Sequence, residues 1–266
     1  MRIAAGIEYN GAAFHGWQSQ SHDRNVQDCL EAALARVADH AVRVHCAGRT
    51  DTGVHALQQI IHFDTDAIRD DHAWILGSNV NLPGDVRVIW ATRVAEDFHA
   101  RFSATGREYH YYILNRAAAP AVQERQLTWE CRPLDAERMA RAAADLVGEH
   151  DFTSYRAVAC QARSSVREVR ELEVSRHGDV IVLRIRANAF LHHMVRNIAG
   201  VLMAIGRGAE EEAWAKQVLD ARDRTLGGVT APPDGLYLAD VAYPERFSLP
   251  KRRSDYCLFY AGGERQ

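Results

Sequence analysis

The sequence predicts an α+β protein built from two halves with mainly antiparallel sheets. Helical stripes and strand-like alternations both occur along the 266 residues. Most strands are expected to be joined by short turns, such as His177-Gly178-Asp179 between strands at 166–176 and 180–187. Neither G-x-G-x-x-G nor G-x-x-x-x-G-K-[ST] occurs, so nothing indicates a nucleotide-binding parallel sheet. Together these features favour helices layered on antiparallel sheets.

The first half begins with a strand and an amphipathic helix. Alternate residues from Ile3 to Tyr9 are apolar, as in a half-buried strand. Asn25 is a suitable N-cap for a helix whose apolar stripe runs to Val37. Further strands are expected at 42–46, 59–63 and 86–94, with a second helix at 71–80.

From about residue 104 the order of elements starts again. A Tyr-rich strand is expected at 107–115, helices at 135–146, 194–205 and 213–221, and a late strand at 236–241. We therefore expect an N-terminal half of residues 1–103 and a C-terminal half of residues 104–266. No Pro/Gly/Ser-rich spacer separates them, so the halves are expected to pack together over a large interface.

The composition is that of a globular protein without a membrane anchor. Hydrophobic residues make up 47% of the chain and charged residues 25%. No apolar run reaches the roughly 18 to 20 residues that a bilayer requires. Glu8 interrupts the start too early for a signal peptide. We expect a cytoplasmic protein with no membrane partner.

Cysteine and histidine spacings do not indicate a metal site. The five cysteines are scattered and contain no C-x-x-C pair, so free thiols are expected. Thirteen histidines are present, but none forms H-E-x-x-H. The neighbours His192 and His193 are expected to point to different faces of their element. We expect no metal.

The charge balance leaves nucleic-acid binding open. A net charge of −3 does not by itself attract a polyanion. Of the 32 basic residues, however, only Lys216 and Lys251 are lysines. Arginine pairs bidentately with phosphate and stacks on bases. Genome base composition is the alternative explanation of the arginine excess. Both RNA binding and base composition therefore remain open as its cause.

Asp51 lies in a loop, Cys46-Ala47-Gly48-Arg49-Thr50-Asp51-Thr52-Gly53-Val54-His55, between two predicted strands. Rigid scaffolds present working carboxylates on such loops, but an aspartate there can also cap a turn. Asp51-Thr52-Gly53 also matches the triplet of aspartic proteases, which need a second aspartate to share a proton. No second D-T-G or D-S-G occurs, so a protease would have to be a symmetric dimer.

The same ten residues resemble the catalytic motif of the TruA-type tRNA pseudouridine synthase family. Other stretches that resemble blocks of this family follow in order: Gly6-Ile7-Glu8-Tyr9-Asn10-Gly11 with Phe14-His15-Gly16-Trp17-Gln18, Asn81-Leu82-Pro83-Gly84-Asp85-Val86, Phe98-His99-Ala100-Arg101-Phe102-Ser103-Ala104, and Asn188-Ala189-Phe190-Leu191-His192-His193-Met194-Val195-Arg196-Asn197. The resemblance spans about residues 3–245. Thr52 stands where many relatives have alanine.

The resemblance implies isomerisation of uridine at positions 38, 39 and 40 of the tRNA anticodon stem-loop. It further implies a homodimer without a cofactor, and an active-site cleft between the two halves. The reaction breaks the bond from uracil N1 to ribose C1′ and rejoins the base through C5, so it needs a carboxylate beside the sugar. Asp51 is the expected carboxylate. Covalent addition and removal of the 2′ proton both remain open, and a non-catalytic RNA-binding protein on the same fold is the alternative function.

Three further residues correspond to active-site positions of the family. Tyr109 matches the tyrosine that stacks on the uracil and helps remove the C5 proton, although its alternation with Tyr111 also suits an ordinary strand residue. Arg196 matches the basic partner that keeps the catalytic carboxylate ionised. Leu236 matches the apolar floor of the uracil pocket, where plain core packing is the alternative.

The resemblance also assigns RNA contacts. Arg49 corresponds to the residue that enters the stem when the uridine is rotated out of the helix. Arg101, Gln161 and Arg163 correspond to residues that hold the RNA during this step. A stripe of arginines that includes Arg163 could then bind the RNA backbone or form a solvated strand edge; its other members are Arg156, Arg167 and Arg170.

Overall fold

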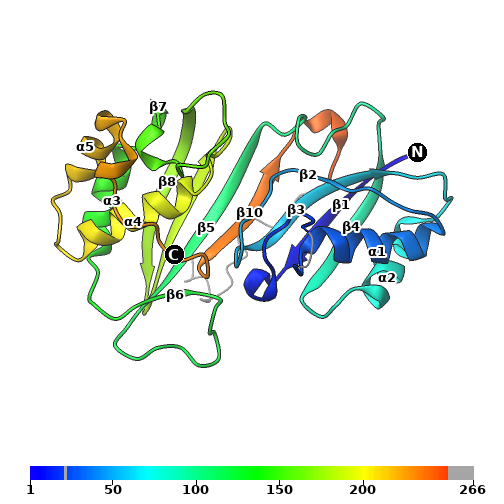
Figure 1. Cartoon of the computed structure of the whole chain (residues 1–266), viewed down its shortest axis with the longest axis horizontal. Helices are drawn as coiled ribbons and strands as arrows, with labels where there is room; N and C mark the ends of the chain where they lie inside the picture. Colours follow the sequence, from blue (N-terminus) through cyan, green and yellow to red (C-terminus); the bar gives the residue numbers. More distant parts are fainter. Residues whose placement is uncertain (21–22, 251–266) are drawn as a thin grey trace, which may run out of the picture. The chain divides into compact units, whose positions relative to one another are not determined.

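The computed structural model describes residues 1–20 and 23–250, which form two compact units. The first unit comprises Met1–Arg107 and residues 237–250, and the second comprises Glu108–Leu236. Each unit combines helices with a mainly antiparallel sheet, which confirms the predicted α+β class (Figure 1). Residues 251–266, which the sequence analysis included in the second half, lie outside the described residues.

The sheet of the first unit has the strand order β4-β1-β3-β10, and β2 pairs with β3. Its strands are β1 (Arg2–Tyr9), β2 (His45–Cys46), β3 (His55–Asp64), β4 (Val86–Val94) and β10 (Leu236–Ala242). β1 pairs antiparallel with both β3 and β4, whereas β10 runs parallel to β3 with Tyr237 opposite His55. The strand expected at 236–241 was assigned to the second half. The structure groups residues 237–250 with the first unit instead.

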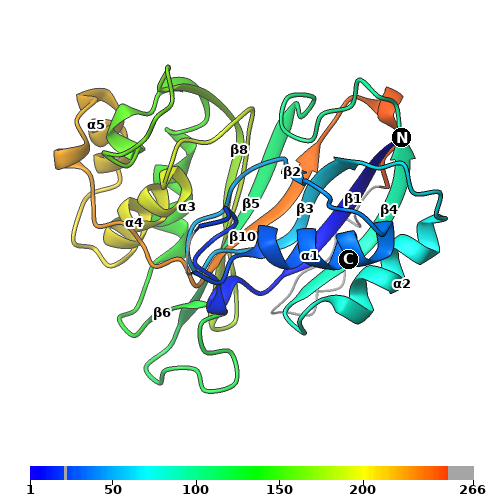
Figure 2. The same ribbon diagram turned by 45° about the vertical axis from the view of Figure 1, so that its right-hand side comes forward.

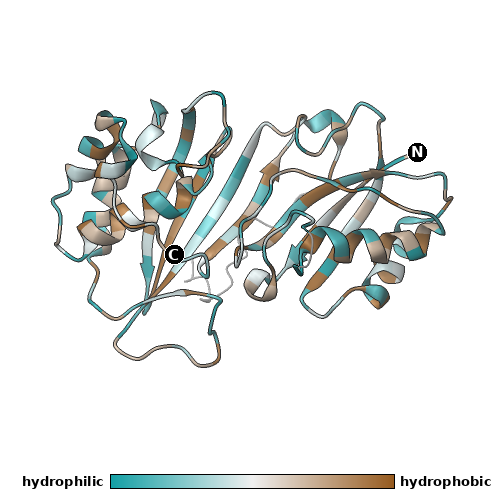
Figure 3. Ribbon diagram, in the orientation of Figure 1, coloured by the Kyte–Doolittle hydropathy of each residue, from teal (hydrophilic) through white to brown (hydrophobic). Residues whose placement is uncertain are grey.

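Two helices, α1 (Val26–Ala38) and α2 (Asp71–Asn81), lie side by side against the sheet of the first unit (Figures 1 and 2). The expected N-cap is confirmed: the side chain of Asn25 accepts a hydrogen bond from the Asp28 N–H at 2.8 Å. Hydrophobic and hydrophilic positions alternate along α1 (Figure 3), and Leu30 and Leu34 are buried. Burial of these apolar stripes holds the helices on the sheet.

The sheet of the second unit has the strand order β5-β9-β8-β7, with β6 parallel to β5. Its strands are β5 (Gly106–Asn115), β6 (Thr128–Glu130), β7 (Gly148–Asp151), β8 (Val166–His177) and β9 (Val180–Ala187). The expected hairpin of β8 and β9 is present, with Val180 opposite His177. β6 and β7 were not predicted, because three or four residues are too few to show a clear alternation.

Three α-helices belong to the second unit: α3 (Ala136–Ala144), α4 (Met194–Gly206) and α5 (Trp214–Ala221). The second unit also has two short 3₁₀ turns, η2 (Thr153–Tyr155) and η3 (Arg224–Leu226), and the first unit has η1 (Gly11–Ala13) and η4 (Glu245–Phe247). α4 is buried along almost its whole length. Within the described ranges, none of the helices has the length and hydropathy to cross a bilayer.

The residues before α4 correct one expectation. His193 adopts a left-handed conformation with φ of 61°. The rings of His192 and His193 therefore lie side by side, with their centroids 4.0 Å apart, instead of pointing to different faces. The expectation assumed regular helix or strand geometry, which this position does not have.

Gly200 provides a test of the packing of α4. A Cβ at Gly200 would lie 1.9 Å from the carbonyl oxygen of Val229. Alanine normally stabilises a helix interior relative to glycine by about 1 kcal/mol. Here the clash is with backbone, so we expect Gly200→Ala to destabilise the protein by about 1–3 kcal/mol and to lower Tm. Thermal unfolding followed by circular dichroism measures this change.

Gly84→Ala is the matched control, because a Cβ there meets nothing within 4 Å. Its Tm should stay close to that of the wild type. Equal Tm values for the two variants would contradict the described packing of α4.

Candidate active site

The loop that carries Asp51 is fixed by main-chain hydrogen bonds on both sides of this residue. The N–H of Trp17 donates to the Thr50 carbonyl at 3.0 Å, and the N–H of Gly53 donates to the Phe14 carbonyl at 3.2 Å. A third bond, from the Val54 N–H to the Asp51 carbonyl at 3.1 Å, closes the turn. The segment around residues 14–17 therefore holds the loop in place.

Glycine is required where these two segments meet. Gly16 has φ of +95°, and a Cβ there would lie 2.8 Å from the Thr50 carbonyl oxygen. Gly53 has φ of +79°. Both conformations are costly for residues with a side chain. The close approach of the two backbones thus depends on these positions.

Side chains from two strands add a second set of restraints. The hydroxyl groups of Tyr9 on β1 and Thr50 share a buried hydrogen bond of 2.8 Å. The amide group of Gln59 on β3 accepts from the Gly48 N–H at 3.3 Å and donates to the Gly48 carbonyl. Sequence reasoning missed Tyr9 and Gln59; the only available signal was a buried polar residue on a strand.

Cys46 begins the loop, and its thiol resists ionisation. Burial raises the pKa of its thiol to about 12, and the nearby positive charge of Arg49 opposes this rise only in part. The thiol therefore stays protonated at neutral pH, and a protonated thiol is a poor nucleophile. Asp51 has no competing cysteine nucleophile in this loop.

Arg101 lies exposed on a tight turn that the first unit holds firmly. The ring nitrogen Nδ1 of His99 accepts from the Arg101 N–H at 3.1 Å. The Nδ1 of His62 accepts from the Ala100 N–H at 3.1 Å, and the hydroxyl of Tyr243 donates to the Ala100 carbonyl at 2.6 Å. The turn is thus bonded to β3 and to the segment after β10.

Arg107 joins this turn to the Asp51 loop. Its Nη2 donates at 3.0 Å to the carbonyl of Arg101 and at 3.0 Å to the carbonyl of Ala47. The first unit therefore carries three of the predicted site residues: Asp51 and Arg49 on the loop, and Arg101 on the turn that Arg107 joins to it. Arg107 itself was not predicted.

The second unit positions Tyr109 on β5. Its ring meets that of Phe190 edge to face, with centroids 4.9 Å apart and an angle of 80°. The next residue on the same strand face, Tyr111, is fully buried and donates to the Pro232 carbonyl at 2.9 Å. Burial raises the pKa of Tyr111, and the charge of Arg196 opposes that rise. Arg196 therefore lies near this face of β5.

Arg196 is anchored at the start of α4 by a reciprocal link. Its Nε donates to the Ala231 carbonyl at 2.8 Å, while the Ala231 N–H donates to the Arg196 carbonyl at 3.1 Å. These bonds fix the plane of the guanidinium. Leu236 is buried, with 6% of its surface exposed. Both the floor of a uracil pocket and plain core packing require such burial.

An arginine that sequence reasoning missed holds the segment beside Arg196. Arg224 donates to the side chains of Asn197 at 3.1 Å and Thr230 at 3.0 Å, and to the Gly228 carbonyl at 3.1 Å. Asn197 follows Arg196 on α4 and donates to the Tyr155 carbonyl. This network fixes the backbone beside Ala231, whose carbonyl accepts the hydrogen bond from Arg196. No local sequence pattern indicates the role of Arg224.

Gln161 and Arg163 are exposed on an irregular segment before β8. Three members of the expected arginine stripe already have protein partners, and one of them is Arg156, which donates to the Ser165 hydroxyl at 3.0 Å. Arg170 pairs with Glu168 at 3.0 Å, and Arg167 donates to the carbonyls of Ser164 and Val166 beside it. The stripe is therefore less available to a ligand than the sequence indicated.

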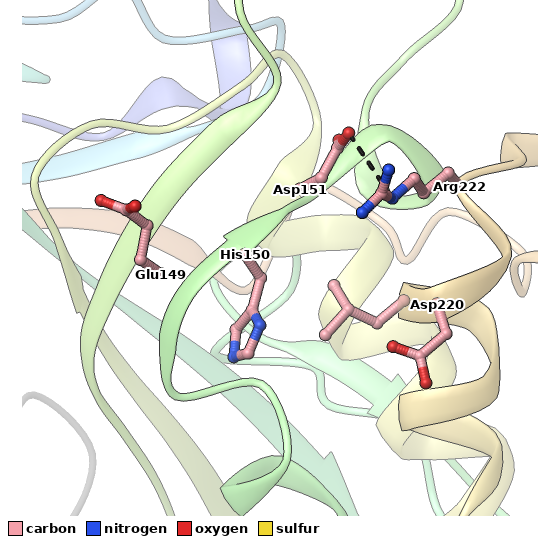
Figure 4. A pocket seen from close by; sticks show the side chains of 6 residues that line it. Glu149, His150, Asp151, Asp220 and Arg222 are labelled. Atoms are coloured by element: carbon pink, nitrogen blue, oxygen red, sulfur yellow. Dashed lines mark ion pairs between the residues drawn. The ribbon is translucent and has the colours of Figure 1, made fainter.

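A small polar pocket occupies another part of the second unit (Figure 4). Arg222 and Asp151 form an ion pair of 3.8 Å at its edge. The remaining lining residues are Glu149, His150, Leu219 and Asp220. None of the residues predicted for catalysis or RNA contact lines it.

Comparison with known proteins places the chain in a family. A family model of tRNA pseudouridine synthases matches residues 5–103 and 142–244. The chain therefore belongs to the tRNA pseudouridine synthase family. Asp51, Arg196 and Leu236 lie inside the matched segments, whereas Tyr109 lies between them.

Individual relatives agree over nearly the whole chain. The tRNA pseudouridine synthase A of Nitrosococcus oceani is 59% identical over 251 residues, which are 94% of this chain and 97% of that protein. The protein of the same name from Alcanivorax borkumensis is 58% identical over 250 residues, or 94% of each chain. That of Salmonella arizonae is 54% identical over 250 residues.

Protonation of His62 is expected to contribute to acid unfolding. Burial lowers the pKa of His62 from 6.5 to about 3, and the neighbouring His99, Arg2 and His45 lower it further, whereas Asp64 raises it. Between these pH values the unfolded chain takes up a proton that the folded chain does not. The free energy of unfolding should therefore fall as pH drops from 6.5 towards 3, by up to about 1.4 kcal/mol per pH unit.

His62→Asn keeps an acceptor near the Ala100 N–H but removes this titration. Urea unfolding between pH 7 and pH 4 should show a shallower loss of stability for the variant than for the wild type. His72→Asn, on the exposed face of α2, serves as the control. Parallel profiles for His62→Asn and the wild type would contradict this assignment.

Proposed function

We propose that this protein isomerises uridine to pseudouridine at positions 38, 39 and 40 of the tRNA anticodon stem-loop, without a cofactor. The observation that carries the proposal is the rigid Asp51 loop in a chain of the tRNA pseudouridine synthase family. The names of its relatives support tRNA as the substrate. The reaction adds and removes no atoms overall, so it needs neither a redox group nor a second substrate.

We propose Asp51 as the catalytic carboxylate. Its loop is bonded to β3 through Gln59 and to the segment that contains Trp17, so the side chain starts from a fixed backbone. A preorganised carboxylate can act on the ribose without the cost of ordering a loop during the reaction. Its chemical role is either covalent addition to the sugar or the base, or removal of the 2′ proton.

Tyr109 and Arg196 complete the proposed catalytic set. The edge-to-face contact with Phe190 restrains the Tyr109 ring, which suits a ring that stacks on uracil. The Ala231 anchor orients Arg196, which suits a cation that keeps a carboxylate ionised. Leu236 is proposed as the apolar contact of the uracil.

Exposed polar residues are proposed to hold the RNA. Arg49 is exposed and two residues from Asp51, where it can take the place of a uridine that has rotated out of the stem. Arg101, Gln161 and Arg163 are also exposed and are proposed to contact the RNA backbone. We further propose that the protein acts in the cytoplasm as a homodimer, which light scattering after size-exclusion chromatography tests.

The substrate is tested by mapping pseudouridine in unmodified tRNA. Purified protein is incubated with an in vitro transcript whose residues 38, 39 and 40 are uridines, in buffer with a metal chelator. Carbodiimide labelling and mass spectrometry should locate pseudouridine at these three positions. Pseudouridine confined to another arm of the tRNA would refute the proposed site of modification.

Asp51→Asn should abolish turnover while tRNA binding and Tm stay near wild-type values. The amide keeps the size of the carboxylate, but it neither attacks the sugar nor accepts a proton. The control is Thr52→Ala, which changes the exposed neighbour in the same loop. Single-turnover rates should fall at least 1000-fold for Asp51→Asn and less than about threefold for Thr52→Ala. A rate for Asp51→Asn within tenfold of wild type would rule out Asp51 as the catalytic group.

A further inference from the structure

Phe102 combines high exposure with a fixed position. Its side chain is 76% exposed. The turn that carries it is closed by reciprocal bonds: the His99 N–H donates to the Ser103 hydroxyl at 2.9 Å, and the Ser103 N–H donates to the His99 carbonyl at 2.9 Å. The His99 ring also accepts the N–H of Phe102 at 3.3 Å. These bonds restrain the backbone of the turn, so the Phe102 side chain cannot easily become buried.

The exposed ring ends a row of aromatic contacts that begins at the sheet. Ring centroids are separated by 4.9 Å between His45 and His62, by 4.5 Å between His62 and His99, and by 4.4 Å between His99 and Phe102. His45 and His62 belong to the paired strands β2 and β3. The row is therefore built on regular secondary structure.

The His99 ring beneath Phe102 is expected to be uncharged at neutral pH. Burial lowers the pKa of His99, and His45, Arg2 and Arg101 lower it further. Its Nδ1 faces the main-chain N–H groups of Arg101 and Phe102, so it acts as an acceptor. Stacking at this site is thus largely independent of ionisation of the supporting ring.

A cation lies over the exposed ring. The Arg101 guanidinium is 5.6 Å from the Phe102 ring centroid and is exposed to solvent. An exposed aromatic ring with an arginine close to it is the combination with which proteins bind unpaired nucleotides: the ring stacks on a base and the cation moves from the ring to the phosphate. Packing against another protein would need a wider apolar surface, and the neighbouring exposed side chain is charged.

We propose that Phe102 is a stacking platform for an unpaired nucleobase of the RNA substrate, with Arg101 contacting the adjacent phosphate. The proposal rests on the proposed function, because it takes a tRNA as the ligand. The base is one that is unpaired in the loop or becomes unpaired when the stem opens. Phe102 acts in binding and takes no part in the chemical step.

The test measures binding of an unmodified tRNA transcript to the full-length protein by fluorescence anisotropy. Phe102→Ala and Phe102→Leu should weaken binding about tenfold or more, because stacking on an aromatic ring is lost. Phe102→Tyr keeps a ring and should bind within about threefold of wild type. Val80→Ala is the matched control, since Val80 is another exposed apolar residue of the first unit, on α2.

Salt dependence separates the two parts of the platform. Loss of a phosphate contact in Arg101→Ala should reduce the slope of log Kd against log salt by about 0.7 to 0.9. Phe102→Ala should weaken binding without changing this slope, because stacking releases no counterions. A reduced slope in Phe102→Ala would show that the substitution acts through Arg101 and would overturn the stacking role.

Two other results decide the proposal. If the wild-type protein forms pseudouridine but Phe102→Ala and Val80→Ala bind tRNA equally well, the stacking platform is wrong and the proposed function stands. Equal weakening by Phe102→Ala and Phe102→Tyr would also overturn it. If the wild-type protein neither binds nor modifies tRNA, the proposed function fails and this inference fails with it.

Discussion

The hydrogen bonds that clamp the Asp51 loop are the constraint on which the described site of the first unit depends. Trp17 and Phe14 bind the loop backbone on either side of Asp51, and Gln59 binds it at Gly48. Because these partners come from a strand and from a glycine-dependent turn, the loop cannot shift without breaking backbone bonds. A catalytic carboxylate benefits from such preorganisation, since little reorganisation remains for the reaction step.

Arginines serve two distinct purposes in this molecule. Arg107 and Arg224 satisfy main-chain carbonyls and hold neighbouring segments together. Arg49, Arg101 and Arg163 are exposed, and they are the ones proposed to meet RNA. The net charge does not reveal the exposed arginines, because carboxylates elsewhere in the chain cancel their positive charge. A net charge of −3 is therefore compatible with a local cationic surface.

Elements with a strong local signal were predicted well. The helix after Asn25 is an example, because one N-cap residue and an apolar stripe within thirteen residues specify it. The short strands β6 and β7 were missed because pairing with β5 and β8 stabilises them. The grouping of β10 with β3 was also missed, since a parallel pair between distant segments leaves no periodic pattern.

The sequence by itself determined the fold class, the main helices and the loop motif around Asp51, because each depends on residues close together in the chain. The family blocks also contain Arg101 and Arg196, and the resemblance assigned a role to Tyr109 outside them. Only the tertiary structure decided which side chains hold these residues. Tyr9 reaches Thr50 across 41 positions, and Arg107 reaches Ala47 across 60. Such bonds are selected by the packing of strands and turns, so no local pattern in the sequence can specify them.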